Sequence, residues 1–218
     1  MSEPTAARRR LLTTRERASS ILLAASAVFA ERGFAGSTVD EIAARAGVSK
    51  LIVYRHFNSK QELYLAILDQ IRDRLADVQP PSSAPTVTDS RGAIAAAIAT
   101  LAAEFAVARE YPDGYRLLHR HAAHEPEFAG YVAGVTAASQ ANAEALLAGV
   151  PDPTVRVWMG RLISRTVNEA FLDWLDVGDP NRDDEMVRRV VHVLGSMVGA
   201  VLTEPTPGRP TPSGADHA

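Results

Sequence analysis

The chain has no cysteine among its 218 residues. This absence excludes disulfide bonds, thiolate metal sites and cysteine nucleophiles. No apolar run approaches the roughly 20 residues that a helix needs to cross a bilayer, and the N-terminal residues do not show a signal-peptide pattern. We therefore expect a cytoplasmic protein with no membrane partner.

The motifs of several enzyme classes are also missing. The sequence has no nucleophile elbow, phosphate loop, dinucleotide fingerprint or helical metal-hydrolase motif. Three histidines, His119, His121 and His124, together with Glu169 and Asp173, leave a helical metal-dependent enzyme as the main alternative. Because no longer ligand pattern accompanies the histidines, we predict no metal site, no cofactor and no enzyme activity.

Lysine is scarce, and the charges are unevenly distributed. The only two lysines are Lys50 and Lys60. Residues 1–60 carry ten basic and five acidic side chains, a net charge of +5; since the whole chain has a net charge of −3, the remainder has −8. A basic N-terminal part on an acidic body is typical of a protein in which one end binds a polyanion.

Apolar residues repeat at helical spacing throughout the chain, and no segment of its second half alternates with period two, so we predict an all-α fold. Three Ser/Thr-x-x-Glu capping boxes mark helix starts, and Gly33 and Gly47 mark helix ends. The boxes are Thr13 with Glu16, Thr38 with Glu41 and Ser59 with Glu62. The predicted helices cover about 14–32, 39–45, 50–57, 60–78, 91–110, 112–123, 126–148, 153–177 and 181–203.

These helices define four parts of the chain. Residues 1–12 are expected to be a flexible basic tail, and residues 204–218, rich in Pro, Gly and Ser, a disordered tail. Residues 13–58 are expected to form a small domain of short helices, and residues 59–203 a larger helical domain. The Pro- and Ser-rich segment 79–88 is expected to be a loop within the second domain.

The segment 38–57 has the pattern of two short helices joined by a tight turn. Ala43 supplies the small residue that a close helix crossing needs, and Gly47 permits the turn. Ile42, Val53 and Phe57, together with Val48, are the positions that pack inward on the first helix. The outward positions of the second short helix are Lys50, Leu51, Ile52, Tyr54, Arg55 and His56. Donor-rich side chains and a helix N-terminus therefore face away from the core together, as groove insertion requires.

Three short motifs carry a family resemblance. Residues 34–39 (Phe-Ala-Gly-Ser-Thr-Val), residues 42–49 (Ile-Ala-Ala-Arg-Ala-Gly-Val-Ser) and residues 54–60 (Tyr-Arg-His-Phe-Asn-Ser-Lys) follow one another in order. In their spacing they resemble the signature of the TetR family of helix-turn-helix transcriptional regulators, over about residues 14–68. The resemblance implies an all-α protein of about nine helices, in which residues 13–58 form a three-helix helix-turn-helix domain that binds DNA. Residues 59–203 would then form a helical domain for effector binding and dimerisation.

The resemblance also implies roles for individual residues. Tyr54, His56 and Lys60 would bind phosphates, Thr38 would cap its helix beside the DNA backbone, and Lys50 with Leu51 would face base edges. The predicted DNA-binding set is Thr38, Ser49, Lys50, Leu51, Ile52, Tyr54, Arg55, His56 and Lys60. Leu51 and Ile52 depart from the smaller and more polar residues of many family members. Apolar contact with thymine methyl groups could replace a missing phosphate hydrogen bond.

Arg8, Arg9 and Arg10 precede the first helix and allow two interpretations. They could reach the minor groove of DNA as an arm. We favour a mobile tail with a general attraction to phosphate, because terminal segments are usually disordered.

The last two predicted helices have long apolar stripes, from Val155 to Leu175 and from Val187 to Leu202. Gly195 and Gly199, four residues apart, would allow another helix to approach closely. Two core-facing helices of a monomer would show the same stripes. The family resemblance instead implies a homodimer through these two helices, and a dimer suits recognition of two half-sites on double-stranded DNA.

Aromatic and polar residues between the dimerisation helices and the DNA-binding end form a candidate ligand site. The predicted members are Phe105, Tyr111, Tyr115, His119, His121, Trp158, Asn168 and Phe171. For any single member, structural packing is the simpler explanation. We predict a TetR-like repressor that binds a palindromic operator as a dimer and is released by a small, largely apolar ligand. The alternatives are the metal-dependent enzyme and a DNA-binding protein without an effector.

Overall fold

The computed structural model describes residues 13–79 and 90–203. Every regular element in these residues is helical, which confirms the all-α prediction. The α-helices are α1 (Thr14–Gly36), α2 (Val39–Arg45), α3 (Lys50–His56), α4 (Lys60–Val78), α5 (Ser90–Glu110), α6 (Pro112–Arg116), α7 (Ala129–Ala145), α8 (Pro153–Val177) and α9 (Asp183–Thr203). A π-helix, η1 (Leu117–His121), and two 3-10 helices, η2 (Ala122–His124) and η3 (Pro180–Arg182), complete the set. Both predicted tails and most of the predicted loop at 79–88 lie outside the described residues.

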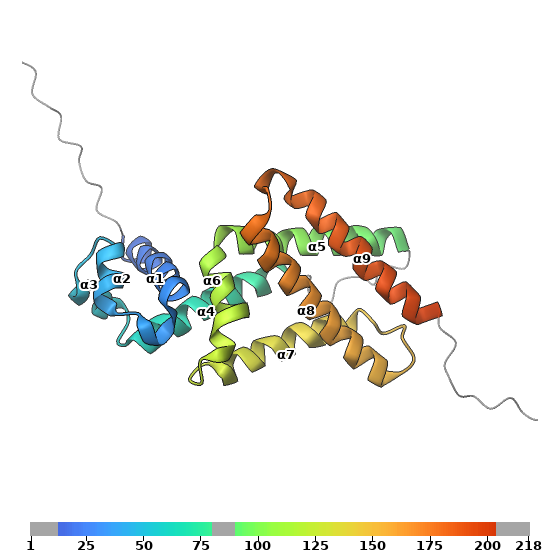
Figure 1. The fold of residues 1–218 in the computed structure, drawn as a ribbon, viewed down its shortest axis with the longest axis horizontal. Helices are drawn as coiled ribbons and strands as arrows, with labels where there is room; N and C mark the ends of the chain where they lie inside the picture. Colours follow the sequence, from blue (N-terminus) through green and yellow to red (C-terminus); the bar gives the residue numbers. More distant parts are fainter. Residues whose placement is uncertain (1–12, 80–89, 204–218) are drawn as a thin grey trace, which may run out of the picture.

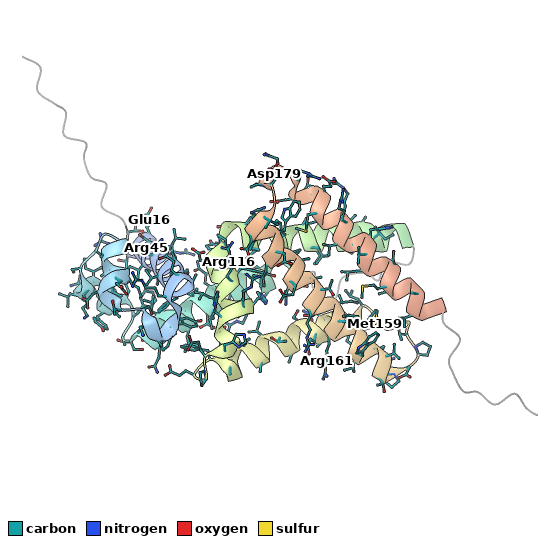
Figure 2. All side chains as sticks on the ribbon, viewed as in Figure 1. Glu16, Arg45, Arg116, Met159, Arg161 and Asp179 are labelled. Atoms are coloured by element: carbon teal, nitrogen blue, oxygen red, sulfur yellow. The ribbon has the colours of Figure 1, made fainter. Side chains whose placement is uncertain are left out.

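The helices form an elongated molecule with two ends (Figure 1). Helices α1, α2 and α3 gather at one end, which we call the head (residues 13–58). Helix α4 runs from the head into a larger group of helices, α5 to α9, and with them makes up the body (residues 59–203). Helices α8 and α9 run along one face of the body, and Asp179 lies at the turn between them (Figure 2).

The head is held by the inward residues that the sequence predicts. Ile42 of α2 is fully buried, and Val53 of α3 and Phe57 just after it are also buried. They belong to the same core as Ile21 and Phe29 of α1. Gly33 and Gly47 have φ angles of 71° and 66°, a left-handed conformation that suits glycine and bends the chain where the sequence predicts helix ends. Helix α1 continues for one short turn beyond Gly33.

Two of the three predicted capping boxes are confirmed in full. At both Thr13 and Thr38 the threonine hydroxyl accepts from the backbone of the glutamate three residues on, and that glutamate accepts from the threonine N–H. The third box forms only in part. The Ser59 hydroxyl accepts from the Glu62 N–H at 3.0 Å, but Glu62 Oε2 instead accepts from the backbone and side chain of Asn58.

One core extends from the head into the body through α4. Its inward side chains Leu63, Ile67, Leu68 and Ile71 are buried, and they belong to the same cluster as the head residues and the centre of the body. Because α4 packs against α1, α5 and α6, a movement of the body is transmitted to the head through packed side chains.

The region predicted as a single helix at 112–123 is divided into three types of helix. An α-helical turn, α6, passes into the π-helix η1 and then into the 3-10 helix η2. The next helix, predicted from residue 126, begins at Ala129, because a turn at 125–128 follows η2. A π-helical turn inside a helix is often associated with a functional site.

Helix α1 is long and apolar enough by length and composition to cross a bilayer, which the sequence analysis did not expect. In this fold its apolar residues Ile21, Ala25, Val28 and Phe29 belong to the buried core. A core helix passes the same test as a membrane helix, so this match is weak evidence for a membrane span.

Candidate nucleic-acid interface and effector site

The outward face of α3 is the exposed surface that best fits a DNA groove. Leu51 is 74% exposed and Tyr54 42% exposed, whereas Val53 between them is buried. Lys50 and Arg55 are exposed, and Arg55 has no ion-pair partner among the described residues. Ser49 is the exposed N-cap of α3, and its hydroxyl makes no capping hydrogen bond. Polar groups at the start of a helix thus face away from the core together.

Two predicted contact residues of α3 are only partly outward. Ile52 is half-buried and packs against the head core, so it supports the helix as well as bordering the exposed face. His56 is also half-buried, with its ring 6.3 Å from that of Phe57. The apolar surface that remains for a thymine methyl group is therefore mainly that of Leu51.

Lys50, a predicted base-reading residue, has an intramolecular partner. Its Nζ donates to Asp40 Oδ2 of α2 at 2.7 Å, and both side chains are largely exposed. The hydrogen bond and the charge of Asp40 raise the pKa of Lys50 above its usual value. Because an exposed pair of this kind is weak, a base or phosphate acceptor can replace Asp40 at low cost.

Lys60, predicted to bind phosphate, lies on the end of α1. Its Nζ donates to the backbone oxygens of Phe34 and Ser37 at 2.7 and 3.0 Å, and lies 4.4 Å from the centre of the Phe34 ring. The ammonium group therefore satisfies carbonyl groups left without a helical partner where α1 bends and stops. The sequence prediction missed this structural role.

Thr38 is exposed, and its hydroxyl is engaged in the capping box of α2. Its hydroxyl accepts from the Glu41 N–H at 3.3 Å and donates to Glu41 Oε2 at 3.0 Å. The other oxygen of Glu41 binds Arg32 of α1 at 2.8 Å, and Arg45 of α2 binds Glu31 at 2.6 Å. These exposed pairs link α2 to α1 but are weak, and buried packing in the head core holds the two helices together.

The structure brings together five of the eight predicted ligand-site residues in the centre of the body. The ring centres of Phe105 and Phe171 lie 4.9 Å apart, and those of Tyr115 and Phe171 6.4 Å apart. The ring centre of Tyr115 is also 4.4 Å from that of His119. The Tyr115 hydroxyl donates to Asn168 Oδ1 at 3.2 Å. Helices α5, α6, η1 and α8 each contribute to this group, which we call the body cluster.

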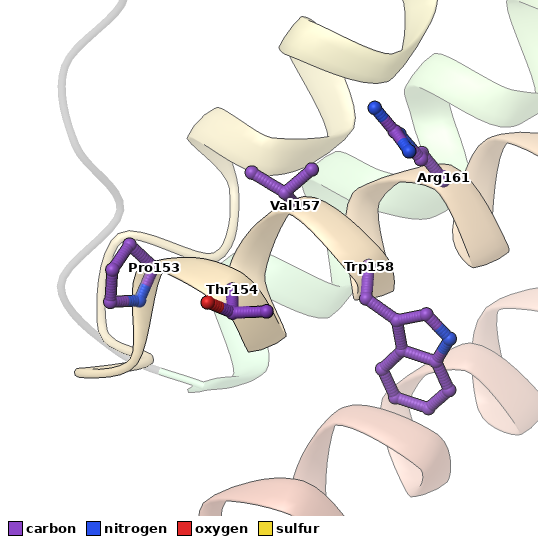
Figure 3. A pocket seen from close by; sticks show the side chains of 5 residues that line it. All are labelled: Pro153, Thr154, Val157, Trp158 and Arg161. Atoms are coloured by element: carbon purple, nitrogen blue, oxygen red, sulfur yellow. The ribbon is translucent and has the colours of Figure 1, made fainter.

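The other three predicted ligand-site residues lie elsewhere. Tyr111 lies against α4, where its hydroxyl accepts from Arg74 at 3.3 Å. His121 is half-buried next to Arg120 and His124, and burial together with these neighbours lowers its pKa. Trp158 is 56% exposed and lines a shallow hollow on α8 with Pro153, Thr154, Val157 and Arg161 (Figure 3). Helical periodicity alone could not show that these side chains leave the common site.

Burial changes the titration of the polar groups in the body cluster. It lowers the pKa of His119 to about 4, so this imidazole is neutral at pH 7. It raises the pKa of Tyr115, with a smaller contribution from Glu104 and Glu169, and it raises the pKa of Glu104 itself. Among residues 13–79 and 90–203, no group of three His, Asp or Glu side chains is placed to hold a metal ion.

Direct contacts join the head, and the first turns of α4 beside it, to the segment that follows η2. Glu125 Oε1 accepts from the Phe34 N–H at 3.2 Å, and Gln61 Nε2 donates to Glu127 Oε2 at 3.0 Å. The Tyr64 ring stacks on that of Phe128 at 4.3 Å, and the Phe34 ring meets Phe128 edge-on at 4.9 Å. Of these four contacts, only the two of Phe34 join the head to the body directly, and the sequence analysis named none of the four.

A helix-turn-helix head on an all-helical body defines the class of the protein: a helix-turn-helix transcriptional regulator. Residues 21–67 match the family model for bacterial regulatory proteins of the tetR family. The transcriptional activator FasR of Mycolicibacterium smegmatis is 34% identical over 184 residues, which cover 81% of this chain and 80% of FasR. The chain belongs to the TetR family, and its relatives are regulators, not enzymes.

Solved structures agree with this fold. A TetR-like transcriptional regulator from Rhodococcus sp. RHA1 aligns with a TM-score of 0.67 at 20% identity, covering 84% of this chain and 97% of that one. AibR, solved in complex with isovaleryl coenzyme A and operator DNA, aligns with a TM-score of 0.59 at 19% identity, covering 82% and 97%.

Proposed function

We propose that this cytoplasmic regulator binds a palindromic operator as a homodimer and changes its affinity for DNA when a small, largely apolar molecule occupies the body. The observation that carries the proposal is the outward face of α3, which presents Lys50, Leu51 and Tyr54 while Val53 fixes the helix on the head core. The residues proposed to contact DNA are Thr38, Ser49, Lys50, Leu51, Tyr54, Arg55 and His56. Ile52 and Lys60 support them.

Dimerisation uses the outward faces of α8 and α9 in this proposal. The apolar stripes that suggested a dimer are largely turned into the chain itself: Met159 and Phe171 of α8 and Val187 of α9 are buried. The large apolar side chains left exposed are Val157, Trp158 and Val177 of α8 and Val193 of α9. A large exposed Trp on a helix face is a frequent energetic centre of a protein interface.

Trp158→Arg tests this dimer. We expect a dissociation constant for the dimer at least about 30-fold larger, since interface tryptophans commonly contribute about 2 kcal/mol or more. Sedimentation equilibrium measures it. Val177→Arg is the matched control, because Val177 is 85% exposed at the other end of α8. A dimer unaffected by Trp158→Arg would show that this part of α8 is not the interface.

The effector acts through the contacts between body and head. A ligand in the body cluster moves α6 and η1, both of which pack against α1, and Glu125 and Phe128 follow directly in the chain. A shift in the positions of α4 and α1 alters the distance between the two heads of the dimer. The heads then fit the spacing of two DNA half-sites better or worse. The expected coupling between ligand and operator is about 1–3 kcal/mol. AibR, with an acyl-coenzyme A and operator DNA in one crystal structure, supports a ligand-responsive body for this fold.

Repression is the direction that the family resemblance implied. FasR, by its name an activator, favours activation as the second candidate. In vitro transcription from the operator-bearing promoter, with and without the protein, distinguishes the two by the sign of the change in transcript.

Selection from a randomised duplex library tests DNA binding itself. We expect an inverted repeat with half-sites about one helical turn apart. On the selected site, Lys50→Ala relaxes the preference at one base pair, whereas Arg55→Ala weakens binding to all sequences and lowers the salt dependence by about one phosphate contact. Recovery of no inverted repeat, or variants indistinguishable from the parent, would contradict the docking of α3.

A further inference from the structure

His119 carries a buried hydrogen-bonding atom that the fold leaves unused. Its Nε2 is fully buried and has no partner among the described residues. The neighbouring polar groups do have partners: Tyr115 donates to Asn168, and Gln79 donates to Glu104. Buried polar atoms are nearly always paired, so a single unpaired one inside a satisfied cluster indicates a missing ligand group.

The surroundings of this atom are mainly aromatic. The Tyr115 ring lies against that of His119, and the rings of Phe171 and Phe105 continue the same cluster along α8 and α5. His119 itself lies in the π-helix η1, a geometry that is rare and frequently found at functional sites. An apolar region with one converging polar group is the usual composition of a small-molecule site.

The charges around His119 select against charged ligands. The imidazole is neutral at pH 7 because burial lowers its pKa to about 4, so it offers a hydrogen bond and no charge. Glu104 on α5 and Glu169 on α8 lie close enough to Tyr115 to raise its pKa, and the charge of Glu169 opposes the entry of a carboxylate. A cation would require Glu104 to ionise, although burial raises its pKa and Gln79 already binds it.

We propose that His119 Nε2 anchors the effector by a hydrogen bond to an uncharged polar group, such as a hydroxyl or carbonyl, while the apolar remainder of the effector lies among Phe105, Tyr115 and Phe171. This inference rests on the proposed sensing function and adds the chemical class of the ligand. Occupancy at His119 moves η1, and Glu125, six residues along the chain, holds the Phe34 N–H of the head.

Three probes of equal chain length test the class of ligand: decan-1-ol, decanoate and decylammonium. Isothermal titration of the full-length protein at pH 7 measures their binding. We expect decan-1-ol to bind at least tenfold more tightly than either charged probe. The affinity of His119→Leu for decan-1-ol should be at least tenfold lower than that of the parent. His119→Met, with a second apolar side chain of similar size, should show the same loss. His124→Leu, an exposed neighbour in the same segment, is the matched control and binds as the parent does.

The same variants separate ligand binding from a structural role. Because Leu removes an unpaired buried atom, His119→Leu raises the Tm of the ligand-free protein by about 2–4 °C. A structural histidine would give a lower Tm in both His119 variants.

Three results would overturn the proposal: no binding of decan-1-ol, tighter binding of a charged probe, or unchanged decan-1-ol affinity in His119→Leu. If decan-1-ol binds through His119 but leaves operator affinity unchanged, the His119 site stands and the proposed sensing function fails.

Discussion

The head and the body are built from the same kind of element but are held in different ways. In the head, helix starts and turns are fixed by contacts between residues close in the chain: capping boxes at Thr13 and Thr38, and left-handed turns at Gly33 and Gly47. In the body, long helices are fixed by packing between distant residues. Gly160 of α8 lies so close to the backbone of α7 that a Cβ added to it would be only 3.1 Å from the Glu144 nitrogen.

This difference has a functional consequence. The head presents a surface that is set locally and can be carried as a rigid unit to DNA. The body holds its polar groups inside, where their energy depends on how the helices pack, and the proposed function places the ligand-driven change of conformation there. The contacts at Phe34, Glu125 and Phe128 are where the two kinds of structure meet.

The largest expected effect is in the body. Gly160→Val places a branched side chain against the α7 backbone, which cannot move aside without separating two helices. We expect a loss of about 3 kcal/mol in the free energy of unfolding, measured by urea denaturation. Gly134→Ala on α7, where an added Cβ meets nothing within 4 Å, is the control and gains about 0.5–1 kcal/mol. Equal effects of the two substitutions would contradict the close approach of α7 and α8.

A somewhat smaller effect is expected from pH. The pKa of His119 is about 4 in the folded chain and about 6.5 in the unfolded chain. Between these values the His119 imidazole binds a proton in the unfolded chain but not in the folded chain. The free energy of unfolding therefore falls as the pH drops from about 6.5 to about 4. The parent should lose about 2–3 kcal/mol more than His119→Leu over this range. Parallel stability curves for the two proteins would show that His119 is not buried in its neutral form.

The next effect concerns the head. Lys60→Met removes the ammonium group from the carbonyls of Phe34 and Ser37 and should lower the free energy of unfolding by about 1–2 kcal/mol. Lys50→Met, which breaks an exposed pair with Asp40, leaves stability unchanged and serves as the control. If instead Lys60→Met kept full stability and reduced the salt dependence of DNA binding, Lys60 would be a phosphate ligand.

The smallest effect lies at the junction of the two regions. Glu125→Ala removes the acceptor of the Phe34 N–H. We expect this amide to exchange with solvent about fivefold faster, because a lost hydrogen bond of about 1 kcal/mol lowers the free energy of local opening by that amount. Hydrogen exchange followed by NMR measures this single amide. Glu127→Ala removes a neighbouring contact to Gln61 and should leave the Phe34 amide unchanged. If the exchange rate of the Phe34 amide were unchanged in Glu125→Ala, the Glu125 contact would not couple the body to the head.

Much of the head could be predicted because its signals are local. The positions of α1 to α4 agree with the predicted helices to within a few residues, and Ile42, Val53 and Phe57 face inward as predicted. The role of Lys60 could not be predicted in the same way, since its partners are 26 and 23 residues away and are backbone atoms without a side-chain signal.

The body could be predicted as helices but not as a site. Helical periodicity identified the elements, yet it cannot distinguish an apolar stripe that faces the chain's own core from one that faces a second copy. Packing decides between the two: Met159 and Phe171 of α8 are buried in the chain's own core, whereas Trp158 is exposed. Periodicity also could not separate Tyr111 and His121 from the cluster around Tyr115.

The sequence by itself determined where the helices of the head begin and end, which face of α3 is polar, and which family the motif resembles, because capping, turns and periodicity act over a few residues. Only the tertiary structure decided that Lys60 holds the end of α1, that the α8 stripe faces inward, and that His119 keeps an unpaired nitrogen at the centre of the body. These features depend on which distant side chains and carbonyls meet, and packing fixes that only when the whole chain has folded.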